Sequence, residues 1–282
     1  MRQRTIKNTV TFTGRGIITG KEISVEIKSA TANSGICFEL SLKDEIHLIP
    51  AQTDFINTSY DNRTALRLPD KKGIEVNFTE HLLSAFHGLG IDNASVAIDN
   101  IEVPFFDGSA AKFVDILSSA GTQEQSTYRR IFVPAETIYL NDGKRRMMLS
   151  PFNGFRVSYY LDYPDTIIGT KVAEIDINES NYRNLIGPSR SFILEKKLPP
   201  DVIKGTYSNP DADSVVIVHK DHYSKKLHSD LEPAYHKILD LLGDLYLAGC
   251  TIQGHISCMR TGHKLNHAMA LKVREALYRQ LV

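Results

Sequence analysis

The sequence of 282 residues is long enough for one large domain or two of ordinary size. Its hydrophobic fraction of 42% supports a substantial buried core, which excludes a chain that is disordered throughout. Lys and Arg together number 33, as do Asp and Glu, so the net charge is zero and nothing global indicates a nucleic acid or an anionic membrane as partner.

Cysteine usage and hydropathy bear on the cellular compartment. Cys37, Cys250 and Cys258 are an odd set without C-x-x-C spacing, which argues against a disulfide framework or a cysteine zinc site. The basic residues at the start are followed by no apolar core of a signal peptide, and no apolar run reaches the roughly 18–20 residues of a membrane span. We therefore expect a cytoplasmic protein without an integral membrane segment. We also expect a monomer.

The first half of the chain is predicted to combine strands with two helices. Period-2 alternation, punctuated by Gly and Asn/Asp clusters, predicts the strands. These strands are 9–13, 22–27, 74–78 and 94–98. A helix is expected over 80–89, stopped by Gly88 and Gly90, and a second over about 109–119. The polar stretch 121–127 is expected to be a structureless linker.

After this linker the pattern restarts. The predicted strands are 131–133, 137–140, 145–149, 155–161, 215–218 and 251–259. A short helix fits 179–185, a longer one contains 236–247 with Pro233 in its first turn, and a last one covers about 265–281. Pro199-Pro200 interrupts the apolar stretch 192–203, so no continuous helix is expected there.

Both halves end in the same order of elements: strands, a helix with a histidine near its start, glycine, a strand, a glycine-containing turn and a helix. A duplicated α+β unit is the economical interpretation, with an N-terminal domain over 1–125 and a C-terminal domain over 126–282. Chance similarity between two ordinary α+β domains is the alternative.

The helix after Pro233 carries the first candidate metal ligands. His236, Asp240 and Asp244 are spaced i, i+4 and i+8, which places them on one helix face. An imidazole and a carboxylate at this spacing can share a cation, although such a pair also occurs by chance on helix surfaces. Their neighbours are strongly apolar, and two carboxylates are costly to bury there without a cation or a donor.

Glu80 and His81 supply the complementary chemistry at the start of the first helix. A hydrolytic zinc enzyme needs three protein ligands, an open position for water and a nearby general base. A glutamate beside a ligand histidine can act as that base. The alternative is structural: Glu80 stabilises the helix N-terminus, Thr79 caps it and His81 fills a gap.

A third candidate, His263, follows Thr261-Gly262 in a turn at the start of the last helix, from which its side chain can project into a cleft as an acid or an oxyanion partner. The alternative is an ordinary helix-terminal residue. His267 offers nothing specific. The residues by themselves thus indicate a metal-dependent hydrolase of duplicated α+β architecture.

Seven segments in this order resemble the LpxC family of zinc-dependent UDP-3-O-acyl-N-acetylglucosamine deacetylases of lipid A biosynthesis. They are 14–20 (GRGIITG), 79–85 (TEHLLSA), 88–94 (GLGIDNA), 102–111 (EVPFFDGSAA), 189–192 (SRSF), 236–247 (HKILDLLGDLYL) and 261–266 (TGHKLN). Together they extend over nearly the whole chain, and several are long and specific.

The resemblance implies a fold of two similar sheet-on-helix domains with the active site between them. It implies zinc as cofactor, with iron(II) as the alternative metal. The implied metal ligands are His81, His236 and Asp240. The other implied site residues are Glu80 as general base, His263 as acid oriented by Asp244, Lys237 beside the developing oxyanion, and Ser191 with Phe192 at the substrate. The implied substrate is a small sugar nucleotide, and the reaction releases acetate.

The sequence also departs from the family pattern. Ile18 stands where the family usually has histidine, Ser191 replaces a threonine, and 231–235 lacks the arginine that precedes the metal histidine in the family. The Gly-Gly-Ser stretch of the family is replaced within 206–213. These departures leave open a deacetylase of the same mechanism that acts on a different N-acetyl amino sugar, with or without an acyl chain. A separate alternative is a catalytically silent binding or scaffold relative.

Overall fold

The computed structural model describes residues 1–198 and 215–281, which form a mixed α+β fold. The strands are β1 (Arg2–Ile6), β2 (Val10–Arg15), β3 (Glu22–Ser29), β4 (Ile36–Leu42), β5 (Glu45–Pro50), β6 (Leu66–Arg67), β7 (Glu75–Val76), β8 (Ala94–Ile98), β9 (Thr122–Tyr128), β10 (Ile131–Phe132), β11 (Ile138–Asp142), β12 (Arg145–Ser150), β13 (Phe155–Tyr163), β14 (Gly169–Asp176), β15 (Phe192–Leu194), β16 (Val216–Val218), β17 (Thr251–Ile252) and β18 (Gly254–Met259). The helices are α1 (Glu80–Leu89), α2 (Ala111–Ala120), α3 (Glu179–Asn181), α5 (Glu232–Tyr246) and α6 (His263–Leu281), with the short helical turns η1 (Thr53–Phe55), η2 (Tyr182–Ile186) and η3 (Glu195–Lys197).

The first large sheet has five strands in the order β2-β3-β8-β4-β5. Its central strand β8 is antiparallel to β3 and parallel to β4, so that Val96 lies between Ile27 and Phe38. All three side chains are fully buried, and β3 alternates buried with exposed positions along most of its length. One face of this sheet therefore builds the core while the other faces solvent.

The second large sheet repeats this topology with the order β11-β12-β18-β13-β14. Here β18 is central, antiparallel to β12 and parallel to β13, and its Ile256 lies between Leu149 and Val157. Strand order and strand directions are the same as in the first sheet. The predicted duplicated α+β architecture is thus confirmed.

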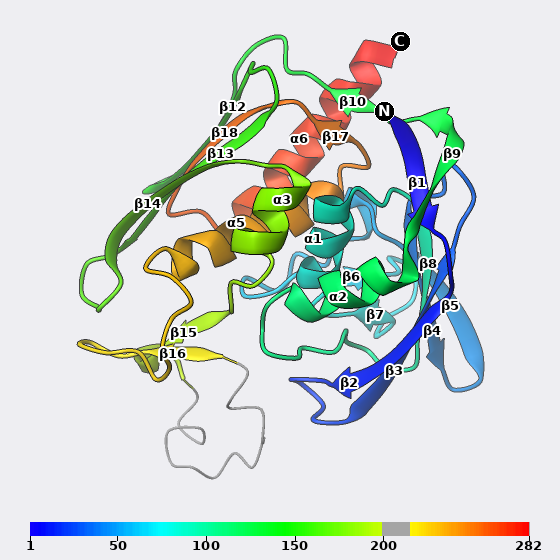
Figure 1. Cartoon of the computed structure of the whole chain (residues 1–282), viewed down its shortest axis with the longest axis horizontal. Coiled ribbons are helices and arrows are strands. Elements are labelled where there is room, and N and C mark those ends of the chain that lie inside the picture. Colours follow the sequence, from blue (N-terminus) through cyan, green and yellow to red (C-terminus); the bar gives the residue numbers. More distant parts are fainter. Residues whose placement is uncertain (199–214, 282) are drawn as a thin grey trace.

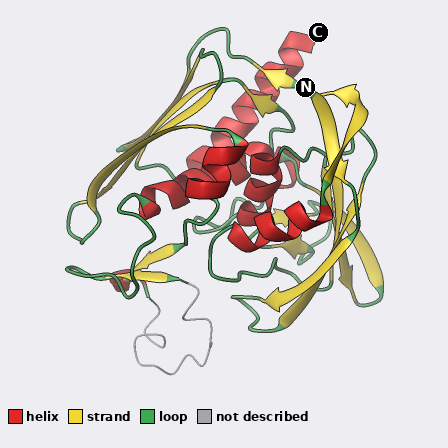
Figure 2. Ribbon diagram, in the orientation of Figure 1, coloured by secondary structure: helices red, strands yellow, loops and turns green. Residues whose placement is uncertain are grey.

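Both sheets lie on the outside, and most of the helical segments pack between them (Figures 1 and 2). Helix α2 contacts β2 of the first sheet, and α5 contacts β13 and β14 of the second. Helices α1 and α5 pack against each other in the middle. Their approach is close because Gly243 has no side chain: a Cβ at this position would lie 2.0 Å from the backbone oxygen of Glu80.

The prediction of a structureless linker over 121–127 is wrong. This segment forms most of β9, which pairs antiparallel with β1 at the start of the chain. The strand expected over 251–259 is divided into β17 and β18, because β17 pairs with β10 outside the large sheet. The Pro199-Pro200 break lies outside the described residues.

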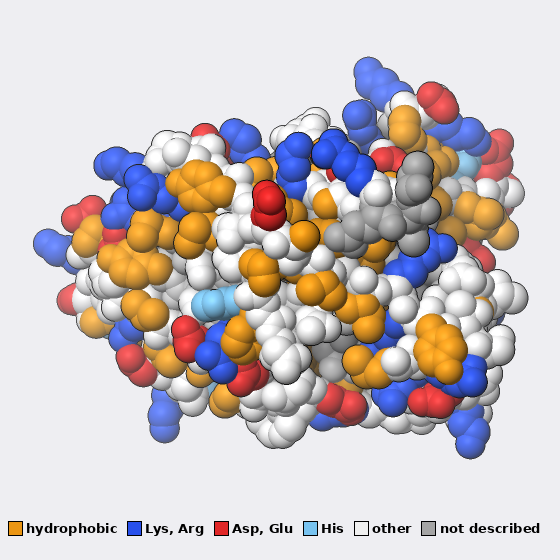
Figure 3. Space-filling view, turned by 90° about the horizontal axis from the view of Figure 1, so that it is seen from above, with side chains coloured by type: hydrophobic (Ala, Val, Ile, Leu, Met, Phe, Trp, Pro, Cys, Tyr) orange, Lys and Arg blue, Asp and Glu red, His pale blue; other side chains and the backbone are white. Residues whose placement is uncertain are grey.

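The surface mixes side chains of both charges with scattered apolar residues, as the face in Figure 3 illustrates. Among the described residues, no helix combines the length and the apolar character that a membrane span needs. The three cysteine thiols are free.

Candidate metal centre

The centre is built where the first turn of α1 meets the middle of α5. Glu80 and His81 open α1, and His236 and Asp240 project from α5 toward them. All four side chains are at most 4% exposed. Thr79, the cap in the structural interpretation of this helix start, makes no side-chain cap; its hydroxyl donates to the carbonyl of Thr64.

His81, His236 and Asp240 present one donor atom each to a common point. Their donor atoms lie within 4.8 Å of one another. The Nε2 atoms of both histidines are 3.5 Å from Oδ1 of Asp240. Ligands at the bond lengths of a tetrahedral zinc ion would be separated by roughly 3.3 Å. The spacing of this donor set therefore fits a zinc-sized divalent cation.

The neighbours of this donor set fix which atoms are free to bind. Nδ1 of His236 donates to the carbonyl of Ser189 at 3.1 Å, which leaves Nε2 with its lone pair. Lys237 Nζ donates to Oδ2 of Asp240 at 2.7 Å, so Oδ1 stays available to the two imidazoles. Burial raises the pKa of Asp240, but interactions with the His236 imidazole and the Lys237 ammonium group outweigh this effect and hold the pKa well below its usual range.

Glu80 lies beside this donor set with one carboxylate oxygen occupied. Its Oε2 accepts a hydrogen bond from the backbone N–H of Thr64 at 3.0 Å. Burial raises the pKa of Glu80, and the charges of His263 and His81 offset this effect only in part. A carboxylate held this way has the raised proton affinity of a general base.

A second buried network centres on Asp244, one turn further along α5. Its Oδ2 accepts from His263 Nδ1 and from Asn266 Nδ2, both at 2.9 Å, and its Oδ1 accepts from the hydroxyl of Thr64. Burial alone would lower the pKa of His263, but the carboxylate of Asp244 raises it to about 9. His263 is therefore protonated at neutral pH, with Nε2 directed toward Asp240 at 3.9 Å from Oδ2.

Asp244, His263 and His267 also have ligand atoms within 4.8 Å of one another. This group is the weaker cation site, because both oxygens of Asp244 already accept hydrogen bonds and Nδ1 of His263 donates one. The imidazole of His267 is occupied as well, since its Nε2 lies 2.9 Å from the hydroxyl of Thr64.

Among the predicted substrate residues, Phe192 is close to the centre. Its ring lies 6.2 Å from that of His236 between centroids, and it also contacts Tyr163. Ser191 immediately precedes it, with its backbone N–H bonded to the carbonyl of Gly108. Ile18 is 43% exposed. The replaced stretch 206–213 lies outside the described residues.

Thr64 and His267 belong to the site although the sequence reasoning passed over both. Thr64 joins Glu80, Asp244 and His267 through its backbone N–H and its hydroxyl. A lone threonine in a loop carries no sequence signal. His267 did carry one: it follows His263 at i, i+4 on the predicted last helix, which places the two imidazoles on one face.

Comparison with known proteins gives a consistent result. The family model described as "LpxC: UDP-3-O-acyl N-acetylglycosamine deacetylase" matches residues 3–275. A protein named UDP-3-O-acyl-N-acetylglucosamine deacetylase from Acidithiobacillus ferrooxidans is 33% identical over 99% of this chain and 91% of its own length. Proteins of the same name from Teredinibacter turnerae and Idiomarina loihiensis are 33% and 30% identical, over 99% and 95% of this chain and 91% and 88% of their own lengths. The chain therefore belongs to the LpxC family of UDP-3-O-acyl N-acetylglycosamine deacetylases.

Proposed function

We propose that this chain is a zinc-dependent deacetylase that hydrolyses the N-acetyl group of UDP-3-O-acyl-N-acetylglucosamine and releases acetate. The observation that carries the proposal is the convergence of three donor atoms from His81, His236 and Asp240 beside a buried glutamate and a protonated histidine. The relatives that match over nearly the whole chain carry the name of this activity.

His81, His236 and Asp240 would hold the metal. A zinc ion there would polarise the amide carbonyl and lower the pKa of a water molecule to roughly 7. Glu80 then takes the proton from the water as its oxygen attacks the carbonyl carbon. The backbone N–H of Thr64 holds the other oxygen of this carboxylate, which aims the base at the reacting water.

His263 completes the reaction on the leaving-group side. As the C–N bond breaks, protonated Nε2 of His263 gives its proton to the departing amine nitrogen. Asp244 holds Nδ1 of the same ring and thereby keeps the tautomer and the charge that this role requires. The ammonium group of Lys237, 2.7 Å from Oδ2 of Asp240, would stabilise the negative charge that develops on the carbonyl oxygen.

Ser191 and Phe192 are proposed to contact the substrate. Phe192 packs edge-on near His236 and Tyr163, which gives the approach to the donor set an apolar wall. The hydroxyl of Ser191 makes no hydrogen bond within the described part of the chain, so it is available to a polar group of the sugar or the acetyl.

One alternative substrate is favoured by a specific observation. Ile18, where the family usually has a histidine, presents a 43% exposed apolar side chain instead of an imidazole. The residue at position 18 thus differs from the family pattern, while the three metal-binding side chains are retained. This combination is what we would expect of a deacetylase with the same mechanism that acts on an unacylated N-acetyl amino sugar.

The two substrates are separated by measuring acetate release from UDP-3-O-acyl-N-acetylglucosamine and UDP-N-acetylglucosamine side by side, with zinc-loaded protein. We expect kcat/KM for the acylated substrate to be higher by at least about 100-fold, because burial of an acyl chain contributes about 0.8 kcal/mol per methylene. Comparable turnover of both would contradict the acylated substrate. Turnover of neither, with full metal occupancy, would contradict deacetylase function itself.

A further inference from the structure

A cavity of about 640 Å³ lies at the ends of α1 and α5 that are remote from the donor set. It is bounded by residues 87–93 at the end of α1, residues 248–253 after α5, the start of β1, the 129–131 segment and the last turns of α6. None of the nine residues predicted for the active site lines it. Its volume is within the roughly 300–1,000 Å³ of small-molecule sites.

This cavity is separate from the proposed active site. His87 lies in its wall six residues beyond His81 on the same helix, which corresponds to about 9 Å along the helix axis. Gly90 and Gly249, which end the two helical segments, both adopt the left-handed conformation and also line the cavity. The two sites thus occupy opposite ends of one helix pair.

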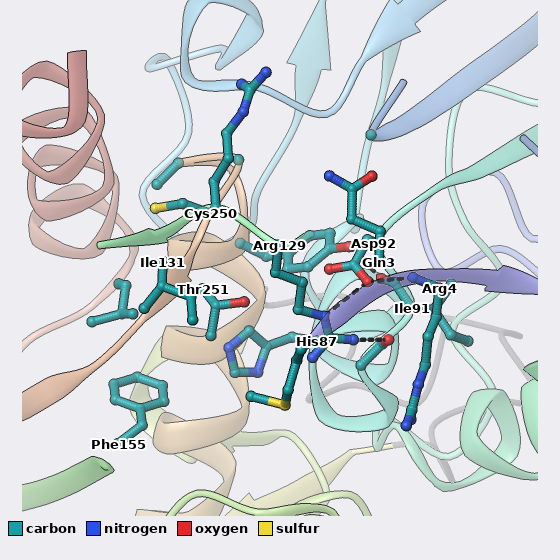
Figure 4. Close-up of a pocket in the computed structure, with 18 of the residues that line it drawn as sticks. Gln3, Arg4, His87, Ile91, Asp92, Arg129, Ile131, Phe155, Cys250 and Thr251 are labelled. Carbon is teal, nitrogen blue, oxygen red and sulfur yellow. Dashed lines mark hydrogen bonds and ion pairs between the residues drawn. The ribbon is translucent and has the colours of Figure 1, made fainter. Parts of the chain in front are cut away.

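Two of the four arginines that line the cavity are neutralised. Arg129 forms an ion pair with Asp92 at 3.0 Å and donates to the carbonyl of Gly90 (Figure 4). Arg274 forms an ion pair with Asp54 at 2.8 Å. Glu179 is the remaining acidic side chain among the lining residues.

Within residues 1–198 and 215–281, the guanidinium groups of Arg4 and Arg130 form no direct hydrogen bond or close ion pair; Arg4 interacts with the Asp92 carboxylate at longer range, and Arg130 is exposed. With Glu179 counted against them, the lining keeps an excess positive charge. A guanidinium group without a protein partner offers a fork of donors that suits a carboxylate or a phosphate.

The rest of the wall offers an apolar surface and one polar group. In Figure 4 the labelled side chains Ile131 and Phe155 lie on one side of His87 and Arg129, and Arg4 lies on the other. Burial lowers the pKa of His87 to about 4, so its ring is neutral and offers one donor and one acceptor. Its Nδ1 is buried without a hydrogen-bond partner in the described part of the chain.

We propose that this cavity is a second binding site, which takes a small organic anion with an apolar body and a phosphate group. The apolar body packs against Ile131 and Phe155, and the phosphate is attracted by the excess positive charge of the lining, to which Arg4 and Arg130 contribute. The proposal does not depend on the reaction that the chain catalyses.

The test uses naphthyl phosphate as probe and naphthol as its uncharged analogue, with binding followed by naphthyl fluorescence. The chain has no tryptophan, so the protein contributes little background at the excitation wavelength. We expect wild-type protein to bind naphthyl phosphate more tightly than naphthol, and added KCl to weaken binding of the phosphate alone.

The double variant Arg4→Gln with Arg130→Gln should bind naphthyl phosphate at least about tenfold more weakly and naphthol unchanged. The matched control is Arg145→Gln with Arg146→Gln, which removes the same charge from two exposed positions of β12. This control should bind both probes as wild type does.

Three outcomes would overturn the proposal: no binding of naphthyl phosphate to the wild type, equal losses in the double variant and its control, or loss of binding in His236→Ala with none in the double variant. The last outcome would show that the anion binds at the proposed active site and not in this cavity. Because binding is measured without turnover, an inactive enzyme with an intact cavity still supports the proposal.

Discussion

Asp244 receives hydrogen bonds from three side chains that come from two distant parts of the sequence: Thr64 in a loop of the first half, and His263 and Asn266 in α6. This arrangement stabilises its negative charge in a fully buried position. The charge in turn raises the pKa of His263 to about 9. The acid of the proposed mechanism is therefore available at neutral pH only as long as Asp244 is ionised.

The variant Asp244→Asn tests this dependence. His263 is protonated below about pH 9, so turnover should fall as the pH rises through that value. Without the carboxylate, its pKa should move toward the ordinary value of about 6.5 or below, and the alkaline limb should shift to lower pH by roughly two units. The pH profile of kcat/KM measures the shift. An alkaline limb at the wild-type position would exclude His263 as the acid.

Glu80 is proposed as a base and not as a metal ligand. The two roles predict different metal contents for a variant that lacks its carboxylate. Glu80→Ala should keep stoichiometric metal, because none of the three donor atoms belongs to it. Its turnover should fall by roughly 100-fold to 10,000-fold, the usual contribution of general base catalysis. Metal analysis and acetate release on the same preparation check both statements. Unchanged turnover would remove Glu80 from the mechanism.

His87 makes stability depend on pH. In the unfolded chain its imidazole takes up a proton below about pH 6.5, but in the folded chain burial delays this to about pH 4. The unfolded state thus binds more protons between these values, and stability falls by at most about 3 kcal/mol as the pH drops across this window. His87→Gln should lose less stability than wild type between pH 7 and pH 4.5, as measured by urea unfolding. Parallel losses in both proteins would contradict this pKa.

At the residue scale, the sequence predicted the groups that carry strong chemistry and missed those that connect them. Glu80, His236 and Asp240 stand out because charged and imidazole side chains are unusual on apolar helices. Thr64 could not be predicted, because its role depends on a loop meeting α1, α5 and α6 in space. His267 was predictable from its spacing to His263 but was passed over.

At the scale of elements, the contact between α1 and α5 determines the geometry of the site. Gly243 of α5 lies against the backbone of Glu80, so the base and the network of Asp244 are held at a separation that any side chain would increase. Six of the proposed site residues belong to these two helices: Glu80, His81, His236, Lys237, Asp240 and Asp244.

Gly243→Ala should therefore lower the free energy of unfolding and slow turnover together. A new Cβ would lie 2.0 Å from the Glu80 oxygen, so the helices must move apart, and overpacking of this kind costs about 1–3 kcal/mol. Urea unfolding and kcat measure the two effects. As a control for stability, Gly262→Ala adds a methyl group where no atom lies within 4 Å. Wild-type stability and kcat in Gly243→Ala would contradict this account.

Regular elements with a clear apolar period were predictable, and elements defined by pairing were not. The helix over 80–89 and the strand over 94–98 have the predicted bounds, since both bury one face in the core. The polar strand β9 gives no such pattern, because most of its side chains are exposed and its formation depends on backbone pairing with β1. The strands β4, β5 and β14 were also not predicted.

At the scale of the whole molecule, the duplicated topology explains how distant segments form one site. In each half of the chain, one helix precedes the central strand of the large sheet: α1 precedes β8 in the first half, and α5 precedes β18 in the second. These two helices pack against each other between the sheets. The internal parallel in the sequence predicted this duplication. It did not predict which faces meet, because the approach of α1 to α5 depends on Gly243 and on packing across the two halves.

The central claim is that His81, His236 and Asp240 hold a divalent metal beside Glu80. Anomalous diffraction from crystals of protein purified without chelator, recorded on both sides of the zinc and iron absorption edges, tests it most directly. We predict one anomalous peak, which appears above the zinc edge. The zinc ion that gives rise to it should be bonded to Nε2 of both histidines and to the carboxylate of Asp240. A peak between Asp244, His263 and His267, or no peak at either edge, would contradict the account.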